Sequence, residues 1–140
     1  MDKNRLLESI KAHEGYRSEP YLDTRNLFTV GYGRLIDAEY RRLFCNPDDH
    51  EKWLHDDLDE CVERAKTYAG EKWATLTDAQ REVLAEMAFQ MGNRIHQFRN
   101  MRQGIEDDDP VEVIEQMKDS NWYKQTPNRV DDLIEKWQSE

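Results

Sequence analysis

The sequence predicts an α+β fold, mostly helical, formed by one domain over residues 1–140. Apolar residues recur at helical spacing along most of the chain, and only residues 27–32 alternate convincingly as a β-strand does. Residues that favour helix starts, such as Thr77 and the Asp109–Pro110 pair, stand where the periodic segments begin. A chain of 140 residues, 37% of them hydrophobic, is long enough to bury roughly two-thirds of its unfolded surface.

Residues 2–14 predict the first helix. Leu6, Leu7 and Ile10 fall on one face, and Gly15 supplies the conformation in which helices commonly end. The strand that follows has two different faces: Phe28, Val30 and Tyr32 on one, and Thr29, Gly31 and Gly33 on the other. A face of threonine and glycine lets another group approach the backbone closely.

Residues 47–69 predict a long helix, with acidic residues early and Lys66 late, as the helix dipole favours. Its apolar positions recur at helical spacing: Leu54, Leu58, Cys61, Val62 and Ala65. We expect this helix to link a small β-containing lobe to a helical lobe.

Three further helices are predicted by their first residues. Thr77 and Gln80 form a capping box, and Gly92 closes the helix that they open. Asp109–Pro110 starts the next helix, and Thr126–Pro127 repeats the device for the last one. The residues expected to face inward are Val83, Leu84, Met87, Ala88 and Met91, then Ile114 and Met117, then Val130, Leu133, Ile134 and Trp137.

Charge and composition exclude several classes of protein. With 20 Lys and Arg against 30 Asp and Glu, the net charge is −10, and no basic stripe exists that could bind nucleic acid. No apolar run approaches a bilayer span, and residues 1–15 lack the apolar stretch of a signal peptide. Cys45 and Cys61 lack metal-ligand spacing and are interpreted as reduced apolar side chains. The histidines expected to be solvated are His50, His55 and His96.

Glu14 and Asp23 are candidates for acid–base chemistry. Glu14 ends a helix, where the negative end of the dipole disfavours the ionised carboxylate and raises its pKa. Asp23 falls in a hairpin turn, where contact with solvent keeps it ionised. Two carboxyl groups in different protonation states suit hydrolysis of a glycosidic bond. Spacing alone leaves the alternative that both are solvated surface acids, since the chain has 30 acidic residues, and that Thr29 is an ordinary strand former.

Three segments resemble one family. The run EGYRSEPYLDTRNLFTVGYGRL over residues 14–35 is similar to the catalytic segment of phage-type lysozymes, the muramidase endolysins of tailed bacteriophages. AFQMGN at 88–93 and NWYKQTPNRV at 121–130 resemble two further signatures in the same order, with the T-even coliphage branch nearest. The resemblance implies a lysozyme-like fold with two lobes: a β-containing lobe at about 13–50, a linking helix at about 48–69, and a helical lobe of 70–140 plus the N-terminal helix.

The resemblance also implies an activity, hydrolysis of the β-1,4 bond between N-acetylmuramic acid and N-acetylglucosamine in bacterial peptidoglycan. Glu14 would be the general acid, Asp23 would be the base or orient the attacking water, and Thr29 would hold that water. No cofactor, no metal, no nucleic acid and no membrane insertion are expected, and the protein would be a monomer. It would cause host cell lysis, reaching the cell wall from the host cytoplasm through a holin-type pore.

Substrate-binding residues are also implied by the resemblance. Leu35 and Phe89 match positions that line the saccharide groove, although both are equally compatible with core packing. Arg129 matches an arginine that approaches the catalytic glutamate and favours its charged form. Met101 and Gln116 stand where the T-even pattern has serine and asparagine, so the sugar contacts at these two positions differ. Gln90 and Trp122 match a buried pair in which an amide oxygen accepts from an indole N–H.

Arg34 departs from the family motif, which has histidine at this position. The resemblance pairs that histidine with an aspartate on the linking helix, and Asp57 stands at the matching place. We therefore expect Arg34 and Asp57 to keep the ion pair with a cation that does not titrate near neutral pH. The alternatives for the whole chain are a lysozyme-fold module that binds without cleaving and a virion-associated lysin that acts at entry.

Overall fold

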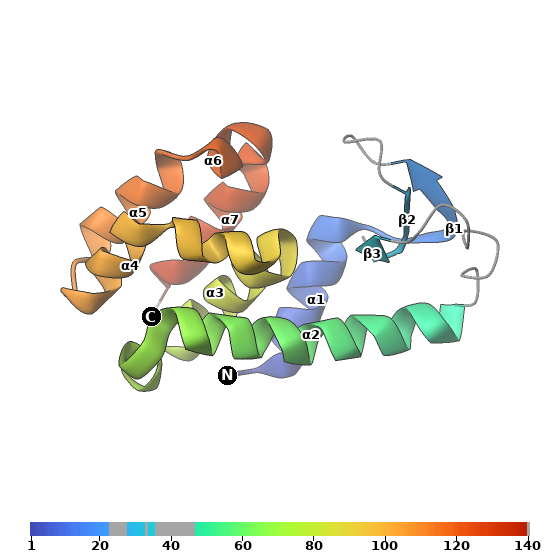
Figure 1. Cartoon of the computed structure of the whole chain (residues 1–140), viewed down its shortest axis with the longest axis horizontal. Coiled ribbons are helices and arrows are strands. Elements are labelled where there is room, and N and C mark those ends of the chain that lie inside the picture. The colour runs from blue at the N-terminus through green and yellow to red at the C-terminus, as the bar shows by residue number, and fades with distance from the viewer. Residues whose placement is uncertain (23–27, 33, 36–46, 140) are drawn as a thin grey trace. The chain divides into compact units, whose positions relative to one another are not determined.

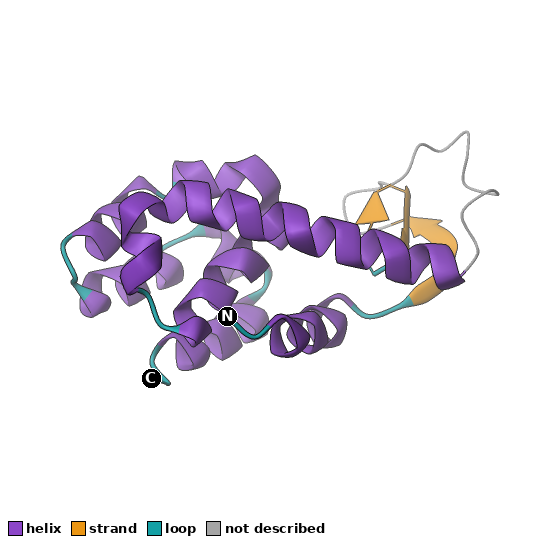
Figure 2. Ribbon diagram, turned by 90° about the horizontal axis from the view of Figure 1, so that it is seen from below, coloured by secondary structure: helices purple, strands orange, loops and turns teal. Residues whose placement is uncertain are grey.

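The computed structural model describes residues 1–22, 28–32, 34–35 and 47–139. The chain divides into two compact units, one of residues 4–59 and one of residues 1–3 with 60–140. Figures 1 and 2 show a mostly helical chain with one small sheet. The sequence grouped the N-terminal helix with the helical lobe, whereas contacts group most of it with the β-containing unit. The lobe boundaries stay a prediction.

The unit of residues 4–59 is built on an antiparallel sheet. Helix α1 (Lys3–Glu14) leads into strands β1 (Arg17–Leu22), β2 (Phe28–Gly31) and β3 (Arg34–Leu35), in the spatial order β1-β2-β3. Helix α2 (Pro47–Ala69) begins in this unit. The sequence predicted β2 and a hairpin turn at Asp23 but did not delimit β1 or β3, because β1 contains Pro20 and β3 has only two residues.

The core of this unit includes one residue that the sequence placed in solvent. Leu6, Leu7 and Ile10 of α1 are buried as expected, and so are Val30 of β2 and Leu54 and Leu58 of α2. His50 is only 1% exposed, so the expectation of a solvated histidine is wrong. The reason lies in the helical repeat: His50 precedes the buried Leu54 by four residues and therefore shares its face.

The second unit consists of helices around α3 (Asp78–Met91). Short 3-10 helices, η2 (Gly70–Thr75) and η3 (Gly92–Gln97), flank it. After η3 come α4 (Arg99–Glu106), α5 (Pro110–Lys118), α6 (Asn121–Gln125) and α7 (Pro127–Trp137). The sequence did not predict η2, η3, α4 or α6. Helix α4 packs closely on α5, because a Cβ on its Gly104 would lie 3.1 Å from Cγ2 of Val113.

Helix α3 carries two buried carboxylates that the sequence did not reveal. All its predicted apolar positions are buried, and Glu82 and Glu86 are also 0% exposed. Each pairs with a basic residue of α7: Arg129 Nε is 3.1 Å from Glu86 Oε2, and Lys136 Nζ is 3.1 Å from Glu82 Oε1. Such partners are needed because a buried charge without a partner is costly. These two pairs therefore fix how α7 lies against α3.

The helix starts follow the sequence with one difference, at Thr126. Thr77 and Gln80 form the predicted capping box, and the Asp109 side chain accepts from Glu112 N. Thr126 precedes Pro127 but makes no cap bond; its hydroxyl instead donates to Trp122 O at 3.1 Å. Val113 and Met117 are the buried residues of α5, while Ile114, expected inward, is half-buried.

No helix among the described residues has both the length and the apolar character that crossing a bilayer requires.

Candidate functional site

Glu14 is the last residue of α1 and is half-buried. Gly15 follows with φ +69°, a left-handed conformation that glycine adopts without strain, and its N–H donates to Lys11 O at 3.0 Å. This turn leads from α1 toward β1. The carboxyl group of Glu14 therefore belongs to the C-terminal end of a helix, as the sequence predicted.

Thr29 occupies the central strand of the sheet. It lies opposite Tyr21 of β1 and Leu35 of β3, so β2 is paired on both sides at this point. Thr29 is 3% exposed. Its neighbour Val30 lines a small cavity with residues of α2, so the Thr29 side chain points to the opposite face of the sheet, as alternation requires.

The sequence predicted that another group could approach the backbone closely at Gly31. In the structure that group is a side chain of the protein itself. Gly31 has φ +66°, and a Cβ built on it would lie 3.1 Å from both Cβ and Cγ of His50. The group that approaches the backbone of Gly31 is therefore the His50 ring, a contact that the sequence did not suggest.

Asp23, the second predicted carboxylate, lies outside the described residues. Leu35 is placed in β3, but its side chain also lies outside what the structure describes. The structure thus brings Glu14 and Thr29 into one unit, and the roles of Asp23 and Leu35 stay predictions.

Polar contacts surround the segment after Glu14. Tyr16 Oη and His50 Nδ1 share a hydrogen bond of 2.9 Å. The Tyr32 hydroxyl donates to Glu51 Oε1 at 3.0 Å, and Lys11 Nζ lies 3.0 Å from the same oxygen. The hydrogen bond from Lys11 holds the pKa of Glu51 below its usual value, and burial raises the pKa of Tyr32.

The predicted ion pair between Arg34 and Asp57 is confirmed. Arg34 Nη1 is 3.5 Å from Asp57 Oδ1. The guanidinium carbon also lies 5.0 Å from the ring centroid of Trp53, within the range of a cation–π contact. The aromatic contact was not foreseen, since it depends on α2 presenting Trp53 one turn before Asp57.

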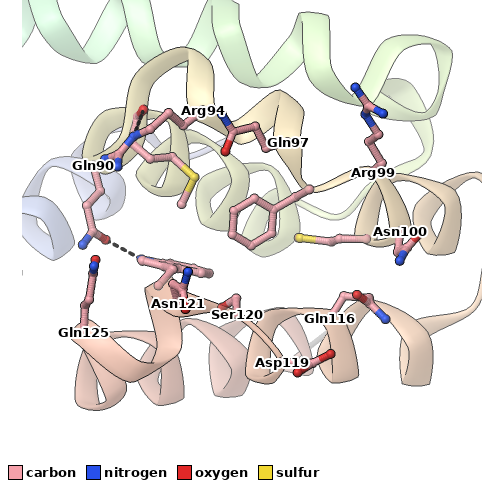
Figure 3. Close-up of a pocket in the computed structure, with 14 residues that line it drawn as sticks. Gln90, Arg94, Gln97, Arg99, Asn100, Gln116, Asp119, Ser120, Asn121 and Gln125 are labelled. Atoms are coloured by element: carbon pink, nitrogen blue, oxygen red, sulfur yellow. Dashed lines mark hydrogen bonds between the residues drawn. The ribbon is translucent and has the colours of Figure 1, made fainter.

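The helical unit contains a pocket of about 570 Å³. Figure 3 shows the labelled side chains reaching it from two sides, one formed by the end of α3, η3 and α4, the other by α5 and α6. Amide side chains dominate the lining: Gln90, Gln97, Asn100, Gln116, Asn121 and Gln125. Phe98 and Trp122 add two aromatic rings, whose centroids are 6.0 Å apart in an edge-to-face arrangement.

Two of the predicted features belong to this pocket. Trp122 Nε1 donates to Gln90 Oε1 at 2.8 Å, which confirms the predicted amide–indole pair. Gln116 lines the pocket, and its amide nitrogen donates to Glu112 Oε1 at 2.8 Å. Met101 also lines it but is 0% exposed, so it offers a ligand little surface.

The other predicted binding residues lie elsewhere in this unit. Phe89 is half-buried on α3 and Arg129 is 9% exposed on α7; neither is among the described residues that line the pocket. Arg129 meets Glu86, a partner that the sequence did not suggest. Its expected approach to Glu14 stays a prediction.

Comparison with known proteins gives a consistent picture. The sequence model of the family described as phage lysozyme matches residues 11–140. A peptidoglycan hydrolase, gp36 of Pseudomonas phage phiKMV, is 32% identical over 126 residues, which cover 88% of this chain but 14% of that protein. Two probable T4-type lysozymes of Dictyostelium discoideum are each 27% identical over 154 residues, covering 92% of this chain and 91% of each relative. The chain thus spans a small part of the phage relative and nearly all of the other two.

Proposed function

The chain belongs to the phage lysozyme family, and on this premise we propose that it hydrolyses the β-1,4 bond between N-acetylmuramic acid and N-acetylglucosamine in bacterial peptidoglycan. The observation that carries the proposal is the placement of Glu14 at the end of α1, in the same unit as Thr29 on the central strand. The names of the relatives, a peptidoglycan hydrolase and two T4-type lysozymes, support the same substrate.

In the proposed mechanism Glu14 gives its proton to the glycosidic oxygen as the bond from the sugar C1 breaks. Water attacks C1 from the opposite face and loses a proton to Asp23. Thr29 holds this water through its hydroxyl group. One proton leaves Glu14 and one reaches Asp23, so the step balances. The product has inverted configuration because water attacks from the face opposite the leaving group, and room for that water requires carboxyl groups about 6.5–9.5 Å apart.

Two features of the residues support these roles. Glu14 is half-buried at the end of α1, so the helix fixes its backbone and part of the side chain is shielded from solvent. Thr29 lies in a strand that is paired on both sides, so its backbone is held more firmly than that of an edge residue. A fixed position suits a hydroxyl that must hold water within hydrogen-bond range.

The proposal assigns substrate contacts to Leu35, Phe89, Gln116 and Arg129. Gln116 lines a pocket of amide side chains beside two aromatic rings, and such groups can bind the hydroxyl and N-acetyl groups of the glycan. The amide of Gln116 already donates to Glu112. Gln116 therefore contributes to glycan binding only through the hydrogen-bonding groups that this bond leaves available.

We further propose the biological setting that the family suggests. The protein acts as a monomeric endolysin, passes from the host cytoplasm to the wall through a holin-type pore, and causes host lysis. The match to a phage peptidoglycan hydrolase supports a phage role, for which action at entry as a virion-associated lysin is the alternative.

The test is clearing of chloroform-treated Gram-negative cells by wild type and Glu14→Gln. We expect Glu14→Gln to lose at least about a hundredfold in rate, because general acid catalysis is worth about that much or more. Glu8→Gln is the matched control, since Glu8 is an exposed glutamate of the same helix, and it should clear cells at the wild-type rate.

The clearing assay is repeated at several salt concentrations, because the chain carries a net charge of −10 and the cell wall is polyanionic. Screening lengths fall from about 30 Å to a few Å between roughly 10 and 500 mM salt, so repulsion weakens and the wild-type rate should rise. Retained activity of Glu14→Gln would contradict the mechanism. A folded wild-type protein that clears no cells at any salt concentration would favour a binding module without catalysis.

A further inference from the structure

His50 contacts both segments that carry the proposed catalytic residues. Tyr16 stands two residues after Glu14, and its hydroxyl is hydrogen-bonded to His50 Nδ1 at 2.9 Å. Gly31 stands two residues after Thr29. A Cβ built on Gly31 would lie 3.1 Å from both Cβ and Cγ of His50. His50 of α2 thus contacts one residue two positions after Glu14 and another residue two positions after Thr29.

The position of His50 is closely determined. The side chain is 1% exposed, and its ring lies 5.5 Å from the Trp53 ring and 5.6 Å from the Tyr16 ring, measured between centroids. Tyr16 in turn lies 4.8 Å from Tyr32. A buried ring packed against aromatic neighbours has few alternative rotamers, so its contacts act as fixed points.

We propose that His50 is a positioning residue that sets the separation of the Glu14 carboxyl and the Thr29 hydroxyl, acting through Tyr16 and Gly31. The inference rests on the proposed function, because it concerns the same two residues. The β1–β2 pairing alone leaves this separation loosely defined, since its register shifts between Arg17 and Tyr21. His50 restrains the two segments where that pairing is irregular.

The role requires Tyr16 to act by its hydroxyl and not by its ring. The residue as a whole remains 42% exposed, whereas its hydroxyl is bonded to a buried partner. Tyr16→Phe keeps the ring and removes only the bond to His50. A displacement near 1 Å at a reacting group lowers rates by up to about a hundredfold, so we expect Tyr16→Phe to lower kcat about tenfold with KM within twofold of wild type.

Tyr32→Phe is the matched control. Tyr32 belongs to the same aromatic cluster, but its hydroxyl donates to Glu51 and not to His50. Removing it perturbs the cluster to a similar degree without touching the link from Glu14 to His50. We expect kcat and KM of Tyr32→Phe to equal those of the wild type.

Two substitutions at His50 separate the hydrogen bond from packing. His50→Leu fills similar volume without a polar group and should lower kcat about tenfold. His50→Asn places an amide near the position of Nδ1 and should restore kcat to within about threefold of wild type. Tyr16→Phe combined with His50→Leu should lower kcat no further than His50→Leu alone, because both substitutions remove the same Tyr16–His50 hydrogen bond.

All variants are assayed on labelled peptidoglycan well below their melting temperatures, so that only folded protein is compared. A wild-type kcat in Tyr16→Phe, or an equal loss in Tyr32→Phe, would overturn the positioning role. Glu14→Gln is measured in parallel. If it is inactive while Tyr16→Phe is fully active, only the positioning role fails; if Glu14→Gln is active, the proposed function itself fails.

Discussion

Arg34 holds Asp57 with a charge that does not change near neutral pH. A histidine in this place would lose its charge as pH rises above about 6.5, and the ion pair would weaken with it. Arginine stays protonated, and it also covers the Trp53 ring. The contribution of this pair to stability should therefore be the same from slightly acidic to slightly alkaline pH.

Asp57→Asn tests that statement. The Arg34 and Asp57 side chains are 41% and 29% exposed, so we expect a loss of about 0.5–1 kcal/mol in the free energy of unfolding. This loss should be constant between about pH 6 and pH 8, because an arginine side chain keeps its charge throughout that range, unlike a histidine. Urea unfolding gives the measurement, with Asp56→Asn on the exposed neighbouring residue as the control. Equal effects of the two substitutions would show that the pair contributes nothing.

Arg129 shows how a residue's partner depends on the fold. The sequence suggested that it favours the charged form of Glu14, but its guanidinium nitrogen lies 3.1 Å from the buried Glu86. Both residues are nearly inaccessible to solvent, so each makes burial of the other tolerable. Arg129 therefore joins α7 to α3, and a substrate contact of Arg129 is an additional proposal.

At the scale of elements, α1 and α2 are joined through Lys11 and Glu51. Their charged atoms lie 3.0 Å apart, and the Tyr32 hydroxyl, just after β2, donates to the same carboxylate oxygen. The hydrogen bond from Lys11 is the largest cause that lowers the pKa of Glu51. Because this pKa is lower in the folded state, the stabilisation exists above the unfolded pKa and disappears as pH falls through the folded value.

Glu51→Gln should therefore have a pH-dependent effect. The Glu51 side chain is 44% exposed, so solvent screens the pair and we expect a loss of only about 0.5 kcal/mol at pH 7. The difference from wild type should shrink as pH falls through the lowered pKa of Glu51, because the carboxylate of the wild type becomes protonated there. Chemical denaturation at several pH values measures it, with the exposed Glu71→Gln as a control that shows no such trend. A difference that persists at low pH would mean that packing, and not charge, is lost.

Local sequence signals account for the long helices. The bounds of α2 match the predicted range of 47–69, and α3 begins directly after its N-cap Thr77 and ends before Gly92. In these segments helical spacing and cap residues agree, so local and tertiary preferences point the same way. The short elements lack that agreement: β3 has two residues, and its identity as a strand depends on β2 beside it.

The candidate site was predictable in part, for physical reasons. Helix-end placement of Glu14 and strand placement of Thr29 follow from local pattern, and both are confirmed. The burial of His50 could have been inferred from its spacing of four from Leu54, but its bond to Tyr16 joins residues 34 apart in sequence. The same holds for Glu82 and Glu86, whose burial depends on cations supplied by α7.

At the scale of the whole molecule, two units carry different parts of the proposed activity. The unit of residues 4–59 contains Glu14 and Thr29, and the unit that includes 60–140 contains the amide-lined pocket. The family match runs across both, from residue 11 to residue 140. The net charge of −10 gives the protein no long-range attraction to a polyanionic wall, so the account places specificity in short-range contacts.

The most direct test of the account identifies the bond that the protein breaks. Purified peptidoglycan is digested with wild type and with Glu14→Gln, the new ends are reduced with borohydride, and the products are analysed by mass spectrometry. If the protein cleaves the proposed bond, wild type gives reduced N-acetylmuramic acid at the new ends and Glu14→Gln gives no new ends. Reduced N-acetylglucosamine at the new ends, or equal products from both proteins, would contradict it.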